Sequence, residues 1–343
     1  MALRTVLTTA FDLAYTGPLM TLTELKYVVA VAREKHFGRA AEACHVSQPT
    51  LSVAIKKLEE ELQVKLFERS ASEVSVTALG EKIVRQAQSV LDQAAAIKEI
   101  ARRGQDPVAG ALTLGVIYTI GPYLLPELVR QSIERTPQMP LILQENFTVR
   151  LLEMLRTGEI DCAILAEPFP DAGLAVAPLY DEPFLAALPS THPLAAQGSI
   201  SAEQLKNETL LLLGAGHCFR DHVLQVCPEF ARYASHTEGI RKAFEGSSLE
   251  TIKHMVAAGM GVTLVPRLAV PPAALQPETR QRYQDENHLC YLPVCESDAS
   301  APPTRRVVLV WRRSFTRYEA IAALRNTVYA CALAGVVRVA SGA

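Results

Sequence analysis

Residues 22–62 contain three short helical patterns separated by very short breaks, and this arrangement restricts the chain to a small set of folds. At the start of this segment, apolar residues recur every three or four positions, which predicts a first helix that ends near Lys35. The alanine-rich stretch 38–44 predicts a second helix. Ser47 is a favourable cap for a third helix, and Pro49 is favourable in its first turn. Two helices joined by such a tight turn predict a helix-turn-helix.

The segments after the third helix extend this pattern. Residues 64–70 and 73–77 alternate apolar and polar side chains around a small polar turn, which predicts two short strands that form a wing. Helical spacing returns from Thr77 to Arg103. A helix of about 27 residues is too long for a single compact domain, so it suits a linker that pairs with a second copy of itself.

Beyond residue 107, short apolar strands alternate with helices, which is the pattern of an α/β domain with a parallel sheet and crossover helices. A second such unit begins near Phe184, and the last strands return to the first unit. Two lobes joined by two crossing segments leave a cleft in which a small molecule would bind. The predicted domains are an N-terminal extension (1–19), a winged helix-turn-helix (20–77), a linker and dimerisation helix (78–106) and a two-lobed regulatory domain (107–183 with 288–343, and 184–287).

Composition excludes several classes of protein. No apolar run in the 343 residues approaches the roughly 18–20 residues of a membrane-spanning helix, and no secretory signal pattern opens the chain. We therefore expect a cytoplasmic protein with no membrane partner.

The seven cysteines are expected to be free thiols. Residues 20–103 carry 13 basic and 11 acidic side chains, a net +2, which permits nucleic-acid binding only if the basic residues share one face.

Several motifs resemble the LysR-type transcriptional regulators. They are FGRAA at 37–41, VSQPTLS at 46–52, IKKLE at 55–59, the wing sequence LFER at 66–69 and MVAAGMGV at 255–262. The resemblance covers nearly the whole chain from Met20. It implies a winged helix-turn-helix that binds promoter DNA, a periplasmic-binding-protein-like regulatory domain, self-association as a dimer or tetramer, and contact with RNA polymerase. It also implies a regulator and not an enzyme, with no cofactor and no metal.

The third predicted helix carries the residues expected to read DNA. A helix in the major groove reads base edges with the side chains of its exposed N-terminal face. Gln48 can bond an adenine and the methyl group of Thr50 can contact a thymine, whereas Lys56 is better placed for a phosphate. The alternative is an ordinary solvated face. The residues predicted to contact DNA are Gln48, Pro49, Thr50, Ser52, Lys56 and Arg69.

Two further segments resemble the members of this family that sense hydrogen peroxide. They are YTIGPYLLP at 118–126 and GAGHCFRDH at 214–222, with Cys227 nine residues after Cys218. The resemblance implies that peroxide oxidises Cys218, that a disulfide with Cys227 follows, and that this change controls antioxidant genes. The residues implied to form the peroxide pocket are Thr119, Thr148, His217, Arg220 and Asp221. Thr119 could instead cap the next helix, and His217 could be a surface loop residue.

The chemistry of this cysteine pair predicts a change of shape. The thiolate attacks peroxide, and nearby cations such as His217 and Arg220 favour it, so Cys218 is the better nucleophile. The resulting sulfenic acid condenses with a second thiol. If residues 219–226 are helical, nine residues separate the two Cα atoms by about 13.5 Å, whereas a disulfide tolerates about 7 Å. Disulfide formation must therefore remodel the segment, which can change subunit packing and the spacing of the DNA-reading helices.

Three alternatives remain open. The protein could be a LysR-type regulator that binds a small organic effector between its lobes, or a thiol peroxidase. His217, Cys218, His222 and Cys227 could hold zinc, although their spacing matches no standard finger. The cysteines expected to be ordinary packed thiols are Cys44, Cys162, Cys290, Cys295 and Cys331, with Cys290 and Cys295 as a less favoured second redox pair.

Overall fold

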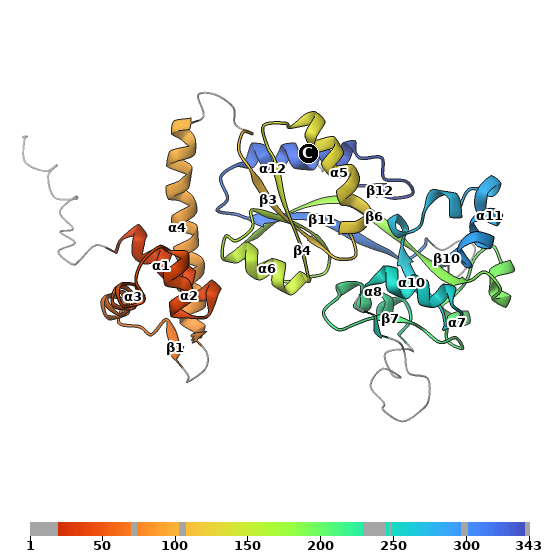
Figure 1. Cartoon of the computed structure of the whole chain (residues 1–343), viewed down its shortest axis with the longest axis horizontal. Helices are drawn as coiled ribbons and strands as arrows, with labels where there is room; N and C mark the ends of the chain where they lie inside the picture. The colour runs from red at the N-terminus through yellow and green to blue at the C-terminus, as the bar shows by residue number, and fades with distance from the viewer. Residues whose placement is uncertain are drawn as a thin grey trace, which may run out of the picture. The chain divides into compact units, whose positions relative to one another are not determined.

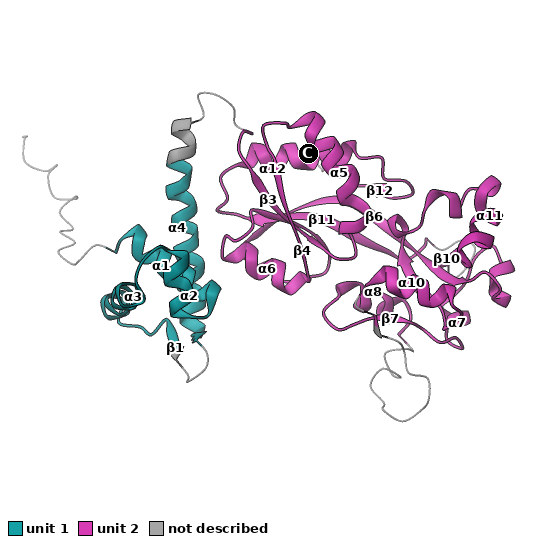
Figure 2. Cartoon of the chain, in the orientation of Figure 1, with its two compact units in different colours: residues 1–99 teal, residues 100–343 magenta. Residues whose placement is uncertain are grey.

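The computed structural model describes residues 20–69, 74–102, 108–228, 245–246, 248–295 and 301–339 (Figure 1). The chain divides into two compact units, residues 1–99 and residues 100–343 (Figure 2). The predicted N-terminal extension and the predicted end of the linker helix at 103–106 lie outside the described residues. The predicted domain boundaries within each unit stay predictions.

The first unit contains the predicted helix-turn-helix and wing. Its elements are α1 (Leu22–Glu34), α2 (Phe37–Ala43), α3 (Gln48–Leu62), β1 (Phe67–Arg69), β2 (Val74–Val76) and α4 (Ala78–Arg102). Local capping explains two of the helix starts. Thr21 and Glu24 form a reciprocal capping box on α1, and the backbone N–H of Thr50 donates to Ser47 Oγ over 3.3 Å on α3. The predicted apolar stripe of α3 packs inward, with Leu51 and Ile55 fully buried.

The wing strands are shorter than predicted. The first begins at Phe67 and not at Val64, because the buried carboxylate of Glu59 accepts the backbone N–H groups of Leu66 and Phe67 over 2.8 and 3.2 Å. The antiparallel pair then runs from Phe67 opposite Val76. The first turns of α4 belong to the same core, since two of its side chains, those of Val84 and Ala87, are buried there. Such a core gains about 1.5–3 kcal/mol for each fully buried large aliphatic side chain.

The second unit has an eight-stranded sheet, a small two-stranded sheet and helices on both faces. The strands are β3 (Leu112–Ile117), β4 (Leu141–Asn146), β5 (Cys162–Ala166), β6 (Leu174–Pro189), β7 (Leu212–Leu213), β8 (Glu245–Gly246), β9 (Thr263–Pro266), β10 (Leu289–Pro293), β11 (Thr304–Arg312) and β12 (Val337–Arg338). The α-helices are α5 (Gly121–Arg135), α6 (Thr148–Arg156), α7 (Ala202–Leu205), α8 (Cys218–Val226), α10 (Leu249–Ala257), α11 (Pro277–Asn287) and α12 (Tyr318–Ala330). Three 3₁₀ turns are η1 (Pro193–Ala196), η2 (Arg267–Ala269) and η3 (Pro272–Ala274).

The prediction of a parallel sheet is only partly right. The strand order is β10-β6-β11-β5-β3-β4, and only β3 pairs in parallel, with β4 and β5. The other pairs of this sheet are antiparallel: β11 pairs with β5, and the long strand β6, which serves both lobes, pairs with β9, β10, β11 and β12. Residues 174–183 of β6 pair with β11, whereas residues 184–189 pair with β9 and β10. The sequence pattern indicated only the second half of this strand.

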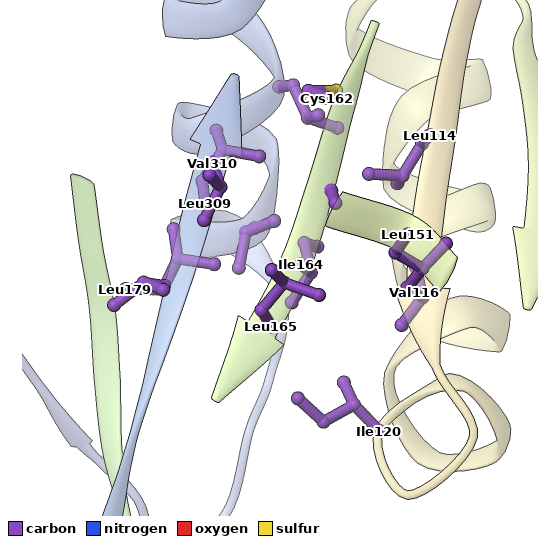
Figure 3. Packing of buried hydrophobic residues seen from close by; sticks show 14 of the residues in the cluster. Leu114, Val116, Ile120, Leu151, Cys162, Ile164, Leu165, Leu179, Leu309 and Val310 are labelled. Atoms are coloured by element: carbon purple, nitrogen blue, oxygen red, sulfur yellow. The ribbon is translucent and has the colours of Figure 1, made fainter. Parts of the chain in front are cut away.

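Each lobe has its own hydrophobic core. In Figure 1, α5 and α12 lie along one side of the first lobe's sheet and α6 along the other. Side chains from β3, β5 and β11 interdigitate there, among them Leu114, Ile164 and Leu309 (Figure 3). The second core gathers around β6, β9, β10 and α10 and includes Phe219 and Cys227. Cys162, Cys290 and Cys331 are buried, and Cys44 and Cys295 are half-buried.

Candidate functional site

The site lies where three loops of the second unit meet. Strands β3 and β4 run in parallel with Ile117 opposite Asn146, so the residues that follow them emerge at the same edge of the sheet. The third loop is the one before α8. Together they enclose a cavity of about 10 Å³, close to the smallest volume that holds one water-sized molecule. Its lining residues are Ile117, Tyr118, Thr119, Asn146, Phe147, Thr148, Gly216, His217 and Cys218.

Cys218 is the first residue of α8, where it is half-buried and packs against the core of the first lobe. Burial raises the pKa of its thiol, while the Thr148 hydroxyl and the Arg305 guanidinium act in the opposite direction. Arg220 donates from Nη1 to the Leu213 carbonyl over 2.9 Å, and Arg305 on β11 is a cation that favours the thiolate and that the sequence did not suggest. The roles predicted for His217 and Arg220 beside the thiol stay predictions.

Arg305 is almost completely buried and holds the Thr119 end of the site. It donates to Thr119 Oγ1 over 2.9 Å and to the Thr119 carbonyl over 3.0 Å. Its Nε donates to the fully buried carboxylate of Glu182 over 2.9 Å. Thr119 does not cap α5, whose N-cap is Ile120 without a side-chain bond. The alternative interpretation of Thr119 as a helix cap is therefore wrong, because its hydroxyl accepts from Arg305.

Thr148 supplies an unsatisfied hydroxyl beside the thiol. It is the first residue of α6, directly after the edge of the sheet. The hydroxyl lies near enough to Cys218 to lower the pKa of the thiol, yet it forms no hydrogen bond of good geometry with any described residue. A buried hydroxyl without a partner costs free energy, and a small polar molecule in the cavity would provide one.

The remaining predicted pocket residues divide into two groups. His217 lines the cavity and is only 7% exposed, so it is not a surface loop residue. The centroid of its ring lies 4.8 Å from the centroid of the Phe147 ring, and the two rings meet edge to face. Asp221 is an exposed residue in the first turn of α8, and neither it nor Arg220 lines the cavity.

Cys227 lies at the opposite end of α8 in a different environment. It is the C-cap residue of the helix, is 2% exposed and belongs to the core of the second lobe. Neither cysteine forms a disulfide. The helical rise separates their Cα atoms by about 13.5 Å, well beyond the reach of a disulfide. Burial raises the pKa of Cys227 to about 11.

A group of three or more metal-binding side chains is not found in the part of the chain that the structure describes. The four residues of the zinc alternative do not gather there. His222 Nε2 instead lies 2.7 Å from the Glu167 carbonyl, and its ring is 5% exposed.

In the first unit, the start of α3 presents the predicted DNA contacts. Gln48, Pro49 and Thr50 are exposed, and Ser52 is half-buried. Lys56 is exposed and forms an ion pair with Glu60 over 3.6 Å. The side chain of Arg69 lies outside the described part of the structure. Val53, on the same helix, is 67% exposed.

Comparison with known proteins identifies the family. Residues 22–81 match the bacterial regulatory helix-turn-helix proteins of the lysR family, and residues 105–330 match the LysR substrate binding domain. The chain therefore belongs to the LysR family of bacterial transcription regulators.

Its relatives define the branch of that family. The DNA-binding transcriptional dual regulator OxyR of Escherichia coli K12 is 40% identical over 306 residues, which cover 88% of this chain and 94% of the relative. A hydrogen peroxide-inducible genes activator of Haemophilus influenzae is 39% identical over 308 residues, 88% of this chain and 95% of the relative.

Two solved structures are similar over most of the chain. A full-length OxyR variant of Pseudomonas aeruginosa is 47% identical, with a TM-score of 0.75, and the match covers 95% of this chain and all of that one. A Corynebacterium glutamicum OxyR variant with H2O2 bound is 34% identical, with a TM-score of 0.57, over 91% of this chain and 92% of that one.

Among the described residues, the search for a helix with the length and apolar character needed to cross a bilayer finds none.

Proposed function

We propose that this protein is a redox-sensing LysR-type transcriptional regulator that detects hydrogen peroxide with Cys218 and stores the signal as a disulfide with Cys227. One observation carries the proposal. The Cys218 thiol shares a cavity of about 10 Å³ with the Thr148 hydroxyl, which has no hydrogen-bond partner among the described residues, and with Thr119, whose own hydroxyl is held by the buried cation Arg305. The relatives named as OxyR and as peroxide-inducible activators support the same function.

The size of this cavity argues against an organic effector at Cys218. Sites for drug-sized ligands usually measure about 300–1,000 Å³. A cavity of about 10 Å³ accommodates a molecule near the size of water. The geometry beside Cys218 therefore favours hydrogen peroxide over an organic metabolite, and the cysteine is not incidental to the site.

The reaction needs two steps and no added cofactor. The Cys218 thiolate attacks one peroxide oxygen, the O–O bond breaks, and the departing hydroxide takes a proton to become water. The sulfur is oxidised to a sulfenic acid. The thiolate of Cys227 then attacks this sulfur and forms the disulfide, and the hydroxyl group leaves as hydroxide, which takes up the proton that the Cys227 thiol released and becomes a second water. One peroxide is reduced for each disulfide formed, and every further turnover would need a reductant that cleaves the disulfide again.

The second step requires α8 to unwind. Cys227 must leave the core of the second lobe, while Cys218 starts against the core of the first. We propose that this rearrangement changes subunit packing within a dimer or tetramer joined through α4. The spacing of the promoter-reading residues Gln48, Pro49, Thr50, Ser52, Lys56 and Arg69 would change with it. The resulting complex would act on RNA polymerase at antioxidant genes in the cytoplasm.

Thiol trapping tests this proposal directly. The reduced full-length protein is treated with one equivalent of hydrogen peroxide, free thiols are alkylated, and peptides are identified by mass spectrometry. We expect protection of Cys218 and Cys227 together and a peptide crosslinked between them. Cys295→Ser, which alters a half-buried thiol outside the cavity, is the matched control and should behave like the unaltered protein. If both cysteines stay reactive in a folded protein, the sensor function is wrong.

A further inference from the structure

We propose that the rings of Tyr118, Phe147 and His217 form a size filter in front of the Cys218 thiol, which admits hydrogen peroxide and excludes hydroperoxides that carry a bulky organic group. The inference rests on the proposed function and adds a specificity element to it. The three rings line the cavity together with Cys218. The rings of Tyr118 and Phe147 are not needed to explain how the thiol reacts, only which oxidants reach it.

The three rings come from three different loops and close on one another. Tyr118 follows β3, Phe147 follows β4 and His217 precedes α8. Their centroids are 5.2 Å apart for Tyr118 and Phe147, 4.8 Å for Phe147 and His217, and 6.0 Å for Tyr118 and His217. Each contact with Phe147 has the edge-to-face geometry that aromatic pairs prefer. The cluster therefore holds the three loops together around the cavity.

The exposed fractions of the three rings show which of them lie at the entrance of the cavity and which lies deeper. Tyr118 is 39% exposed and Phe147 is 37% exposed, whereas His217 is 7% exposed. Two large rings thus lie at the surface on the rim of the cavity, and the third lies further in. Gly216 allows the close approach of the third loop. It has φ +98°, and a Cβ atom there would lie 3.3 Å from the Phe147 ring.

The volume behind the rings sets the selectivity. A hydrogen peroxide molecule consists of two oxygen atoms, so the space near the thiol needs little expansion to accept it. A tert-butyl or cumyl group adds a volume closer to that of benzene, which requires an apolar cavity of about 150 Å³. With any of these oxidants the outer oxygen passes to sulfur and the remainder leaves as water or as an alcohol. The chemistry is therefore shared, and only access differs.

The test compares oxidants of different size on the full-length reduced protein. Second-order rate constants for Cys218 oxidation are measured with hydrogen peroxide, tert-butyl hydroperoxide and cumene hydroperoxide. We expect Phe147→Ala to reduce the preference for hydrogen peroxide over cumene hydroperoxide by roughly tenfold or more. Phe147→Trp, which restores a large ring, should recover the preference. Val149→Ala, two residues further on at a site that is 75% exposed, is the matched control and should leave it unchanged.

Alkylation separates this inference from the proposed function. In the same variants, labelling of Cys218 by the small reagent methyl methanethiosulfonate is compared with labelling by the bulky reagent N-phenylmaleimide. A filter predicts that Phe147→Ala accelerates the bulky reagent far more than the small one, whether or not peroxide oxidises the protein. An unchanged ratio of the two labelling rates in folded Phe147→Ala would overturn the filter. Failure of the unaltered protein to react with peroxide would instead overturn the sensor function.

Discussion

The two ends of α8 place two chemically identical side chains in opposite surroundings. Cys218 begins the helix, contacts the core of the first lobe and lines the small cavity. Its pKa is raised by burial but lowered by Thr148 and Arg305. Cys227 ends the helix inside the core of the second lobe, where burial alone raises its pKa to about 11. Both thiols thus have a raised pKa, but of the two only Cys218 has neighbouring groups that partly offset the effect of burial, which fits the roles proposed for the two cysteines.

In the proposed mechanism, this difference places the two steps of the switch at two locations. The first step depends on polar groups from β11 and from the loops after β3 and β4. The second depends on how readily Cys227 leaves an apolar core, which is a question of packing. Changes at one end should therefore leave the behaviour of the other end unaltered. The following predictions depend on that separation, and the largest expected effect comes first.

The largest effect is expected at the Cys218 end. Arg305→Met removes the partner of the fully buried Glu182 carboxylate. An uncompensated buried charge typically costs about 3–5 kcal/mol in the free energy of unfolding. The same change removes a cation that lowers the Cys218 pKa, so peroxide should oxidise the thiol more slowly. Urea denaturation and stopped-flow oxidation measure the two effects.

The adjacent Arg306 provides the control for this experiment. It bonds Asp181 over 2.8 Å at the exposed surface. Its second bond to the same carboxylate makes the pair bidentate, but exposed pairs contribute only about 0–1 kcal/mol, so Arg306→Met should lose much less stability than Arg305→Met and should leave the oxidation rate unchanged. Equal losses of stability in the two variants would contradict a special role for the buried pair.

Arg305 also shows which part of the site was beyond prediction from the sequence. The loops that carry Thr119, Thr148 and His217 were placed by their resemblance to a family. Arg305 bonds Thr119 across 186 positions of the chain, and no local pattern encodes such a pairing. The nearer Arg220 was the obvious candidate in sequence, but the fold directs it to a backbone carbonyl. The only sequence feature that could have pointed to Arg305 was its position as a charged residue at the start of an apolar strand.

The fold was predictable to the extent that it depends on local patterns. The helix starts at Thr21 and Ser47 follow from side chains that cap the next turn. The first half of the long strand β6 was missed, since it contains Pro178 and Pro183 and two acidic residues, which are typical of a break between strands. Its antiparallel partners lie far away in sequence, so the sheet direction was wrong for most of its strands.

The second prediction concerns the Cys227 end and its dependence on pH. Because the folded pKa is raised to about 11, this thiol contributes stability that is complete below its ordinary pKa near 9 and is lost as pH rises through 11. Two pKa units correspond to roughly 2–3 kcal/mol. Between pH 8.5 and 11, reduced protein should therefore lose about that much more stability than Cys227→Ala does.

Denaturation curves at several pH values in the presence of a reductant measure this difference. Cys331 has a pKa raised to about the same value, but it is present in both proteins and its contribution cancels. Parallel pH profiles for the two proteins would show that Cys227 ionises as freely in the folded chain as in the unfolded one. The contrast between the two ends of α8 would then be wrong.

The smallest effect is expected for a single hydroxyl group at the Cys218 end. Thr148→Val keeps the shape of the side chain and removes a buried hydroxyl that has no hydrogen-bond partner among the described residues. Stability should therefore stay the same or rise slightly. The oxidation rate should fall by about tenfold, the value of one neutral hydrogen bond, because the hydroxyl no longer assists the thiolate or the peroxide. Stopped-flow measurement of Cys218 oxidation tests the rate.

Thr263→Val in the second lobe should show the reverse of Thr148→Val, a loss of stability without a loss of oxidation rate. The Thr263 hydroxyl donates to the Leu211 carbonyl over 2.7 Å, so its removal leaves a buried acceptor unpaired. This variant should lose about 1–3 kcal/mol of stability while its rate of reaction with peroxide is unchanged. A satisfied hydroxyl thus stabilises the fold, whereas the unsatisfied one at Thr148 is available to a ligand. If both variants lost stability and neither lost rate, Thr148 would be an ordinary packing residue and the cavity would no longer indicate where peroxide binds.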